Sequence, residues 1–154
     1  MTLVRATGAD SSVGSIYFKG PRSPFSNLYR IEDGIDIWGH TFYSVEQAYQ
    51  WRKAVLHNLH RRAERILTLT DPYRIKQEGS FKTNDNWEAR KSSLMLDLLF
   101  LKLESCPQFI CALRESFPKL LVEDTANEYW GRGPDNRGLN TLGCLLMHVR
   151  GTLI

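Results

Sequence analysis

The helix predicted over residues 86–103 constrains the fold of this chain most, because its second half has almost no polar face. The run LMLDLLFLKL at residues 94–103 is apolar nearly all round a helical wheel. A helix of this kind is covered on most sides in a folded protein. We therefore expect it at the centre of the core, with Asp85 and Glu88 forming a capping box at its start.

The remaining pattern predicts an α+β fold, a single compact and mainly helical domain with a small β-hairpin or sheet. Residues 1–14 read as a flexible lead and residues 15–154 as one domain, with no linker or repeat inside it. The expected elements are a strand at 15–18, a hairpin formed by 35–38 and 41–43, and helices at 45–56 after a Ser44 cap, 59–69 and 108–117.

Composition excludes several classes of protein. The chain is 42% hydrophobic and 24% charged, and its net charge of +3 is too small to predict wrapping by a nucleic-acid backbone. It has no run of eighteen apolar residues and no apolar leader, so we expect an intracellular protein without a membrane span. Cys106, Cys111 and Cys144 lack metal-ligand spacing and are expected to be buried thiols. The four histidines also lack metal-ligand spacing, so no metal is expected. No cofactor is expected either.

The clearest chemical signal in the first helix is the segment SVEQAYQWRKA. At about 100° per residue, Glu46, Tyr49, Gln50 and Lys53 fall on one stripe. If the stripe faces a pocket, Glu46 can act as a general acid or base, and Lys53, beside Arg52 and partly desolvated, can have a lowered pKa and attack an electrophilic carbon. The alternative is an exposed amphipathic face.

A second signal is the stretch 121–150, in which acids, amides, glycines and aromatics precede an apolar helix. Gly131, Gly133 and Gly138 permit a ligand to approach the main chain, and Tyr129 and Trp130 offer flat faces for a sugar or base. Asn140 is expected to cap a helix that buries Leu142, Leu145, Leu146 and Val149. The alternative is a long surface turn in which Trp130 fills the core.

Asn27 and Trp87 each allow a ligand-binding and a structural interpretation. Asn27 can present its amide to a ligand or form an Asx-turn in a proline-rich loop. Trp87 can stack on a base or sugar, or belong to the core.

Four segments, taken together, resemble the NADAR, or YbiA-like, family over about residues 16–152. They are GPRSPFSNLY, FYSVEQAYQWRKA, Trp87-Glu88 with Met95 and Lys102, and LVEDTANEYWGRG followed by GLNTLGCLLMHVR. The resemblance implies a small α+β domain that cleaves an N-glycosidic bond between a ribose-type sugar and a base without a metal. Two substrate classes are associated with the family: ADP-ribose on guanine, and phosphoribosylated intermediates of riboflavin biosynthesis.

The resemblance also implies roles for individual residues. Glu46 and Lys53 would be the catalytic pair, with Lys53 able to form a Schiff base to the sugar, and Glu123 would lie across the site. The substrate-binding residues would be Asn27, Tyr49, Gln50, Trp87, Tyr129, Trp130, Gly131, Arg132, Gly133 and Asn140.

The chain departs from riboflavin-type members of the family at Arg132, where those members often carry an acid, and at Glu128, which directly precedes Tyr129. A positive charge there suits a pyrophosphate or nucleic-acid backbone. We therefore expect ADP-ribosylated guanine, in nucleic acid or in a nucleoside, as the substrate, with an ADP-ribosyltransferase toxin as a functional counterpart. The alternatives are a riboflavin-pathway hydrolase and a module that binds ADP-ribose without turnover.

Overall fold

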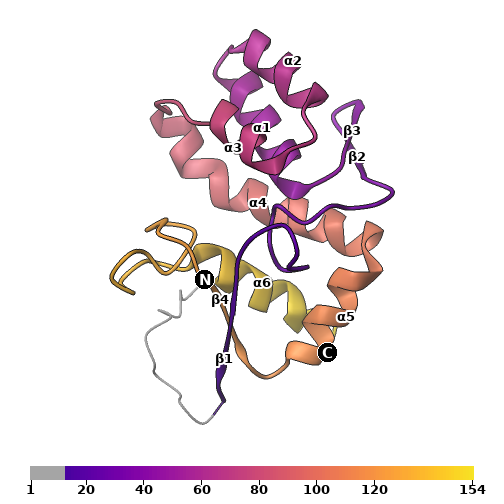
Figure 1. The fold of residues 1–154 in the computed structure, drawn as a ribbon, viewed down its shortest axis with the longest axis vertical. Helices are drawn as coiled ribbons and strands as arrows, with labels where there is room; N and C mark the ends of the chain where they lie inside the picture. Colours follow the sequence, from indigo (N-terminus) through magenta and orange to yellow (C-terminus); the bar gives the residue numbers. More distant parts are fainter. Residues whose placement is uncertain (1–12) are drawn as a thin grey trace. The chain divides into compact units, whose positions relative to one another are not determined.

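The structure is a computed structural model that describes residues 13–154. Residues 1–12, most of the expected flexible lead, lie outside the described part. The described chain is an α+β protein whose packing divides into two units. One unit is Asn27–Cys106, and the other combines the residues up to Ser26 with Pro107–Ile154. Figure 1 shows the elements in sequence colours, and each unit is described by itself below.

The unit Asn27–Cys106, called the central unit here, contains a hairpin and four helices. Its elements are β2 (Ile35–Ile37), β3 (His40–Phe42), α1 (Val45–Leu56), α2 (His60–Thr68), α3 (Pro72–Glu78) and α4 (Asp85–Ser105). The two strands pair antiparallel, as the sequence predicts, although His40 belongs to the second strand and not to the turn.

The N-terminal end of α1 is fixed by a set of side-chain hydrogen bonds. Ser44 Oγ accepts the backbone N–H of Gln47, so the predicted cap is confirmed. Gln47 in turn accepts the N–H of Tyr43 and donates to the carbonyl of Ile66 at the end of α2. The helix is thereby held to both the hairpin and its neighbouring helix, which sets the direction of its side chains.

The sequence analysis was wrong about two features of this unit. It missed α3, although Asp71 accepts the N–H of Tyr73 as its cap and Pro72 occupies the first turn, a typical pair of start signals. It also placed the cap of α4 one residue late. Asn84 accepts the N–H of Trp87, and Asp85 is already helical, because the side chain at the preceding position reaches the exposed N–H groups.

The long helix α4 lies against α1 and supplies much of the core of the central unit. Met95, Leu98 and Leu99 are buried, as expected. Lys102 is also fully buried, and its ammonium group lies 5.7 Å from the centre of the Tyr29 ring. A lysine in this position is the most unusual feature of the helix, since Lys is almost never fully buried.

The second unit, called the terminal unit here, contains a parallel pair of strands and two helices. Its elements are β1 (Ser15–Phe18), α5 (Pro107–Ser116), β4 (Leu120–Glu123) and α6 (Thr141–Gly151). β1 and β4 pair in parallel, with Ser15 opposite Leu120 and Phe18 opposite Glu123. The sequence analysis read the β4 segment as loop, because a four-residue strand gives little period-2 signal without its partner.

Helix α6 packs its apolar side as predicted, with Leu142, Leu145, Leu146 and Val149 buried. The expectation of three buried thiols is wrong for Cys111, which is exposed on α5, and Cys144 is only partly buried. No helix in residues 13–154 combines the length and the apolar character that a bilayer span requires.

Candidate active site

The predicted stripe on α1 is turned into the protein. Only 8% of Glu46, 5% of Tyr49 and 7% of Gln50 are exposed, and Lys53 is half-buried. The alternative of an exposed amphipathic face is therefore wrong. Because helical geometry already aligns these side chains, their burial brings an acid, a phenol, an amide and an amine into one desolvated row.

Glu46 is held by the residue one turn later on the same helix. Gln50 Nε2 donates to Glu46 Oε1 at 2.8 Å. Burial raises the pKa of the Glu46 carboxyl, an effect that the Gln50 hydrogen bond and the charges of Lys76 and Lys53 only partly oppose. The protonated, proton-donating form of Glu46 is therefore favoured beyond the usual pH range of a carboxyl group.

Gln50 fits its position because residue 79 is glycine. A Cβ atom at Gly79 would lie 1.8 Å from Gln50 Oε1, an impossible distance. The φ angle of Gly79 is −83°, which any residue adopts, so close approach and not backbone conformation requires glycine here. Gln50 Oε1 is buried and has no hydrogen-bond partner among the described residues.

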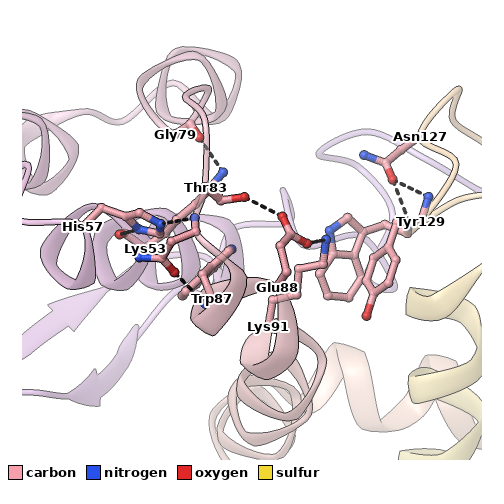
Figure 2. A network of polar contacts seen from close by, with 11 residues as sticks. Lys53, His57, Gly79, Thr83, Trp87, Glu88, Lys91, Asn127 and Tyr129 are labelled. Atoms are coloured by element: carbon pink, nitrogen blue, oxygen red, sulfur yellow. Dashed lines mark hydrogen bonds and ion pairs between the residues drawn. The ribbon is translucent and has the colours of Figure 1, made fainter.

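Lys53 is anchored to the same glycine. Its Nζ donates to the carbonyl oxygen of Gly79 (Figure 2) at a distance of 2.6 Å. The same Nζ lies 4.9 Å from the centre of the Phe81 ring. Burial lowers the pKa of the Lys53 amine; Lys91 adds to this effect, and Glu46 and Glu88 oppose it. The lowered pKa was expected from the sequence, but its main cause is desolvation and not the neighbouring Arg52.

Beyond Lys53, a polar network continues to the first turn of α4. Glu88 accepts a hydrogen bond from Thr83 Oγ1 and forms an ion pair with Lys91 (Figure 2). These contacts replace the predicted capping box, since Glu88 uses its carboxylate on side chains. They also hold Lys91 close enough to Lys53 to affect its pKa.

Trp87 lies in the core of the central unit. It is 3% exposed, and its ring centre lies 5.2 Å from that of Tyr49 and 6.0 Å from that of His57. The core interpretation of Trp87 is therefore the one that the structure favours. Its packing supports Tyr49 and with it the α1 stripe.

Asn27 lies at the start of α1. Its backbone carbonyl accepts the N–H of Glu46 at 3.0 Å, and its side-chain Nδ2 contacts Met95 Sδ at 3.3 Å. Its Oδ1 is buried without a hydrogen-bond partner among residues 13–154. An unsatisfied buried amide oxygen costs about 1–3 kcal/mol, so Asn27 holds an acceptor ready for a donor.

A groove in the central unit lies on another face of α1. Its volume is about 290 Å³, and it runs between α1 and α4 with Arg52, Leu56 and Arg90 among its walls. Of the predicted site residues, only Trp87 lines it. The groove is therefore separate from the buried acid and amine.

In the terminal unit, the glycines of the loop before α6 serve the loop itself. A Cβ at Gly131 would lie 2.3 Å from Thr125 Oγ1, and one at Gly138 would lie 2.4 Å from the carbonyl of Gly131. Gly133, the third glycine of this loop, has a positive φ of 76°, whereas Gly131 and Gly138 do not. Close packing within the loop therefore explains why Gly131 and Gly138 are glycines, and the approach of a ligand to their main chain stays a prediction.

Arg132 has partners within the terminal unit. Its Nε lies 3.2 Å from Asp124 Oδ1, and its guanidinium lies 5.1 Å from the centre of the Tyr17 ring. The side chain is still 36% exposed. Tyr129 and Trp130 are half-buried and meet edge to face at 4.8 Å, while Asn127 accepts both of their backbone N–H groups.

Asn140 precedes α6, but its side chain does not cap the helix. It has a left-handed backbone, with φ at 50°, and its amide bridges to β4. Oδ1 accepts the N–H of Glu123, and Nδ2 donates to the carbonyl of Leu121. The predicted position of Asn140 as the cap residue before α6 is confirmed, but the expected side-chain hydrogen bond to the helix is not formed. Asn140 instead fixes Glu123, whose half-buried carboxylate accepts a hydrogen bond from Thr125 Oγ1.

The predicted residues thus fall into two sets. The central unit brings together Asn27, Glu46, Tyr49, Gln50, Lys53 and Trp87, and the terminal unit holds Glu123, Tyr129, Trp130, Gly131, Arg132, Gly133 and Asn140. Among the described residues, no group of three or more His, Cys, Asp or Glu side chains is arranged to hold a metal ion.

Comparison with known proteins assigns the chain to a family. The NADAR domain family model matches residues 17–154. The chain belongs to the NADAR family. N-glycosidase YbiA of Escherichia coli (strain K12) is 31% identical over 120 residues, which are 77% of this chain and 75% of that protein. The NMR structure of E. coli YbiA covers 97% of this chain and 90% of its own, with a TM-score of 0.73 and 28% identity.

A second kind of relative matches only in part. The chloroplastic riboflavin biosynthesis protein PYRR of Arabidopsis thaliana is 34% identical over 77 residues, which are 49% of this chain and 13% of that protein. The proteins that this chain resembles are therefore named for two activities.

Gly79 and Phe81, which contact Lys53, were not predicted from the sequence of this NADAR chain, because no local pattern marks them. Lys102 was noted only as part of the family resemblance. Its complete burial lowers the pKa of its amine to about 7.

Proposed function

We propose that this NADAR protein is an N-glycosidase that removes ADP-ribose from guanine. The observation that carries the proposal is the opposite shift of two pKa values on α1. Burial raises the pKa of Glu46 and lowers that of Lys53, which share one helical stripe. Titratable groups whose environments push their pKa values in opposite directions are typical of acid and nucleophile pairs in active sites.

Glu46 is the proposed general acid. Guanine is a poor leaving group as an anion, and a proton delivered as the C1′–N bond breaks lowers the barrier. Because burial raises the pKa of the Glu46 carboxyl, it keeps that proton to a higher pH than an exposed carboxyl does. The Gln50 hydrogen bond fixes the Glu46 carboxyl so that its proton is delivered from one position.

Lys53 is the proposed nucleophile. As the bond from C1′ to guanine breaks, guanine leaves with the electron pair and takes the Glu46 proton, and the neutral Lys53 amine forms a bond to C1′. The amine then loses a proton to the Glu46 carboxylate, the ribose ring opens to an imine, and water hydrolyses the imine to release ADP-ribose. One difficult displacement is thereby divided into two easier steps.

The choice of ADP-ribose as the sugar rests on charge. Lys76 and Lys91 lie close enough to Glu46 and Lys53 to affect their pKa values, so the amine has further cations around it. These cations suit a substrate with more than one phosphate. Arg132 contributes less to phosphate binding than the sequence predicts, because it already forms an ion pair with Asp124.

A second candidate function is hydrolysis of a phosphoribosylated intermediate of riboflavin biosynthesis. The partial match to the PYRR proteins favours it. The same acid and amine serve that reaction, so the two candidates differ in the substrate and not in the chemistry. A module that binds ADP-ribose without turnover is less well supported, because binding alone does not require a desolvated acid and amine on one stripe.

One comparison tests the proposal. The protein is incubated with ADP-ribosyl-guanosine, ADP-ribosylated DNA and a phosphoribosylated aminopyrimidine, and free base and free sugar are followed by mass spectrometry. We expect release of guanine and ADP-ribose from at least one of the first two substrates. Cleavage of the aminopyrimidine alone would favour the second candidate, and cleavage of none would leave the binding module.

A further inference from the structure

The positive charge of this chain is concentrated in one part of the central unit. Residues 52–91 contain ten of the 20 lysines and arginines but only five of the 17 acids. Although the net charge of the whole chain is only +3, the segment that includes α2, α3 and the start of α4 is strongly cationic.

The outer part of this segment is a group of arginines around one acid. Arg65 donates two hydrogen bonds at 3.1 Å to the Glu78 carboxylate, and Arg62 donates to the Glu78 carbonyl at 3.0 Å. These contacts and the charge of Arg74 hold the pKa of Glu78 below its usual value. The Glu78 carboxylate thus pairs with two guanidinium groups and is influenced by the charge of a third, so this part of the surface carries excess positive charge.

An aromatic ring connects these arginines to the candidate active site. Phe81 has the Arg62 guanidinium at 5.6 Å from its ring centre and the Lys53 amine at 4.9 Å. Two more lysines belong to this region: the charge of Lys76 affects the pKa of Glu46, and that of Lys91 affects the pKa of Lys53. We call the five cations Arg62, Arg65, Arg74, Lys76 and Lys91 the cationic band.

We propose that the cationic band binds the phosphate backbone of a single nucleic-acid strand and leads its modified guanine to Glu46 and Lys53. This inference rests on the proposed function. Spaced cations match a polymer with one phosphate per nucleotide, and they position the strand without reading its sequence. Tyr73, which is 54% exposed and adjacent to Arg74, offers a ring on which a base can stack.

The first test measures binding alone, with an unmodified single-stranded oligonucleotide as the probe and fluorescence anisotropy as the readout. The double variant Arg65→Gln with Arg74→Gln removes two cations that are not among the groups shifting the pKa values of Glu46 and Lys53. We expect at least about 10-fold weaker binding and a salt-dependence slope smaller by about 0.7 per lost phosphate contact. Arg65→Lys with Arg74→Lys, which keeps both charges, should retain most of the affinity.

The matched control is Arg114→Gln with Lys119→Gln. It changes the net charge by the same amount at two exposed positions of the terminal unit. We expect it to bind the oligonucleotide with nearly unchanged affinity and slope. The inference is overturned if the unaltered protein does not bind the oligonucleotide, if both glutamine variants lose binding equally, or if the band binds phosphatidylserine vesicles in place of the oligonucleotide.

The second test separates this inference from the proposed function. The ratio of kcat/KM for an ADP-ribosylated oligonucleotide to that for ADP-ribosyl-guanosine should fall at least about 10-fold in the Arg65→Gln, Arg74→Gln variant. An unchanged ratio overturns the inference and leaves the proposed function intact. If neither substrate is cleaved but oligonucleotide binding depends on the two arginines, the proposed function fails and the band stands as a nucleic-acid surface.

Discussion

Lys53 donates its amine proton to the carbonyl oxygen of Gly79 at 2.6 Å, across 26 residues of sequence. The hydrogen bond fixes the amine beside the Phe81 ring and away from bulk water. Gly79 also makes room for Gln50, which holds Glu46. A single backbone position therefore orients both the proposed nucleophile and the proposed acid.

We predict that Lys53 becomes covalently attached to the sugar during turnover. Borohydride added to the reaction should reduce the imine and give an adduct with the mass of the protein plus the sugar moiety. Lys53→Ala should abolish the adduct, while Lys82→Ala, a change at an exposed lysine nearby, should leave it. Trapping at another lysine, or full activity of Lys53→Ala, would contradict the covalent role.

Glu46→Gln should lower kcat by at least about 100-fold with the fold intact, because it keeps the shape of the side chain but removes the proton that it donates. If Glu46 is the acid, activity of the unaltered protein should fall as pH rises through the raised pKa of Glu46. That descending limb should be missing in the variant. Near-normal turnover, or an unchanged pH profile, would assign the acid role elsewhere.

The same substitution should stabilise the protein at neutral pH. A carboxyl whose folded pKa is raised stabilises the fold in its protonated form, and this contribution is lost as pH rises from about 4.5 through the folded pKa. Gln has no such charge to bury. We expect Glu46→Gln to have the higher Tm at pH 7 and the two Tm values to converge below about pH 4.5, as measured by calorimetry.

Gly79→Ala should impair both stability and turnover. The new methyl group would meet Gln50 Oε1, so Gln50 must move and release Glu46. We expect a loss of about 1–3 kcal/mol in the free energy of unfolding, typical of overpacking. In the double variant with Gln50→Ala the clash is gone, so stability should recover while kcat stays low. Recovery of both would show that Gln50 does not position Glu46.

Arg132→Ala tests whether this arginine binds a pyrophosphate. A charged hydrogen bond to the ligand predicts that ADP-ribose binding weakens by about 1.5–3 kcal/mol in calorimetry. If the arginine only pairs with Asp124 on the surface, the change should be below about 1 kcal/mol. Arg137→Ala is the control, because Arg137 is 87% exposed in the same loop. Equal and small effects of both variants would remove Arg132 from the site.

Most of the helices and the resemblance to the NADAR family can be predicted from the sequence alone. Helix starts depend on a few adjacent residues, as with Ser44 before α1, and the apolar run of α4 marks its central position. The alignment of Glu46, Tyr49, Gln50 and Lys53 also follows from the helical period alone. These properties are local, so they can be read along the chain.

The environment of these residues follows only from the tertiary structure. Burial shifts the pKa values of Glu46 and Lys53, and it depends on which elements cover α1. The partners of Lys53 and Asn140 lie 26 and 17–19 residues away and leave no local pattern. Desolvation and long-range hydrogen bonds arise only when distant segments meet, which is why the sequence aligns the side chains of Glu46 and Lys53 but does not show how their pKa values are shifted.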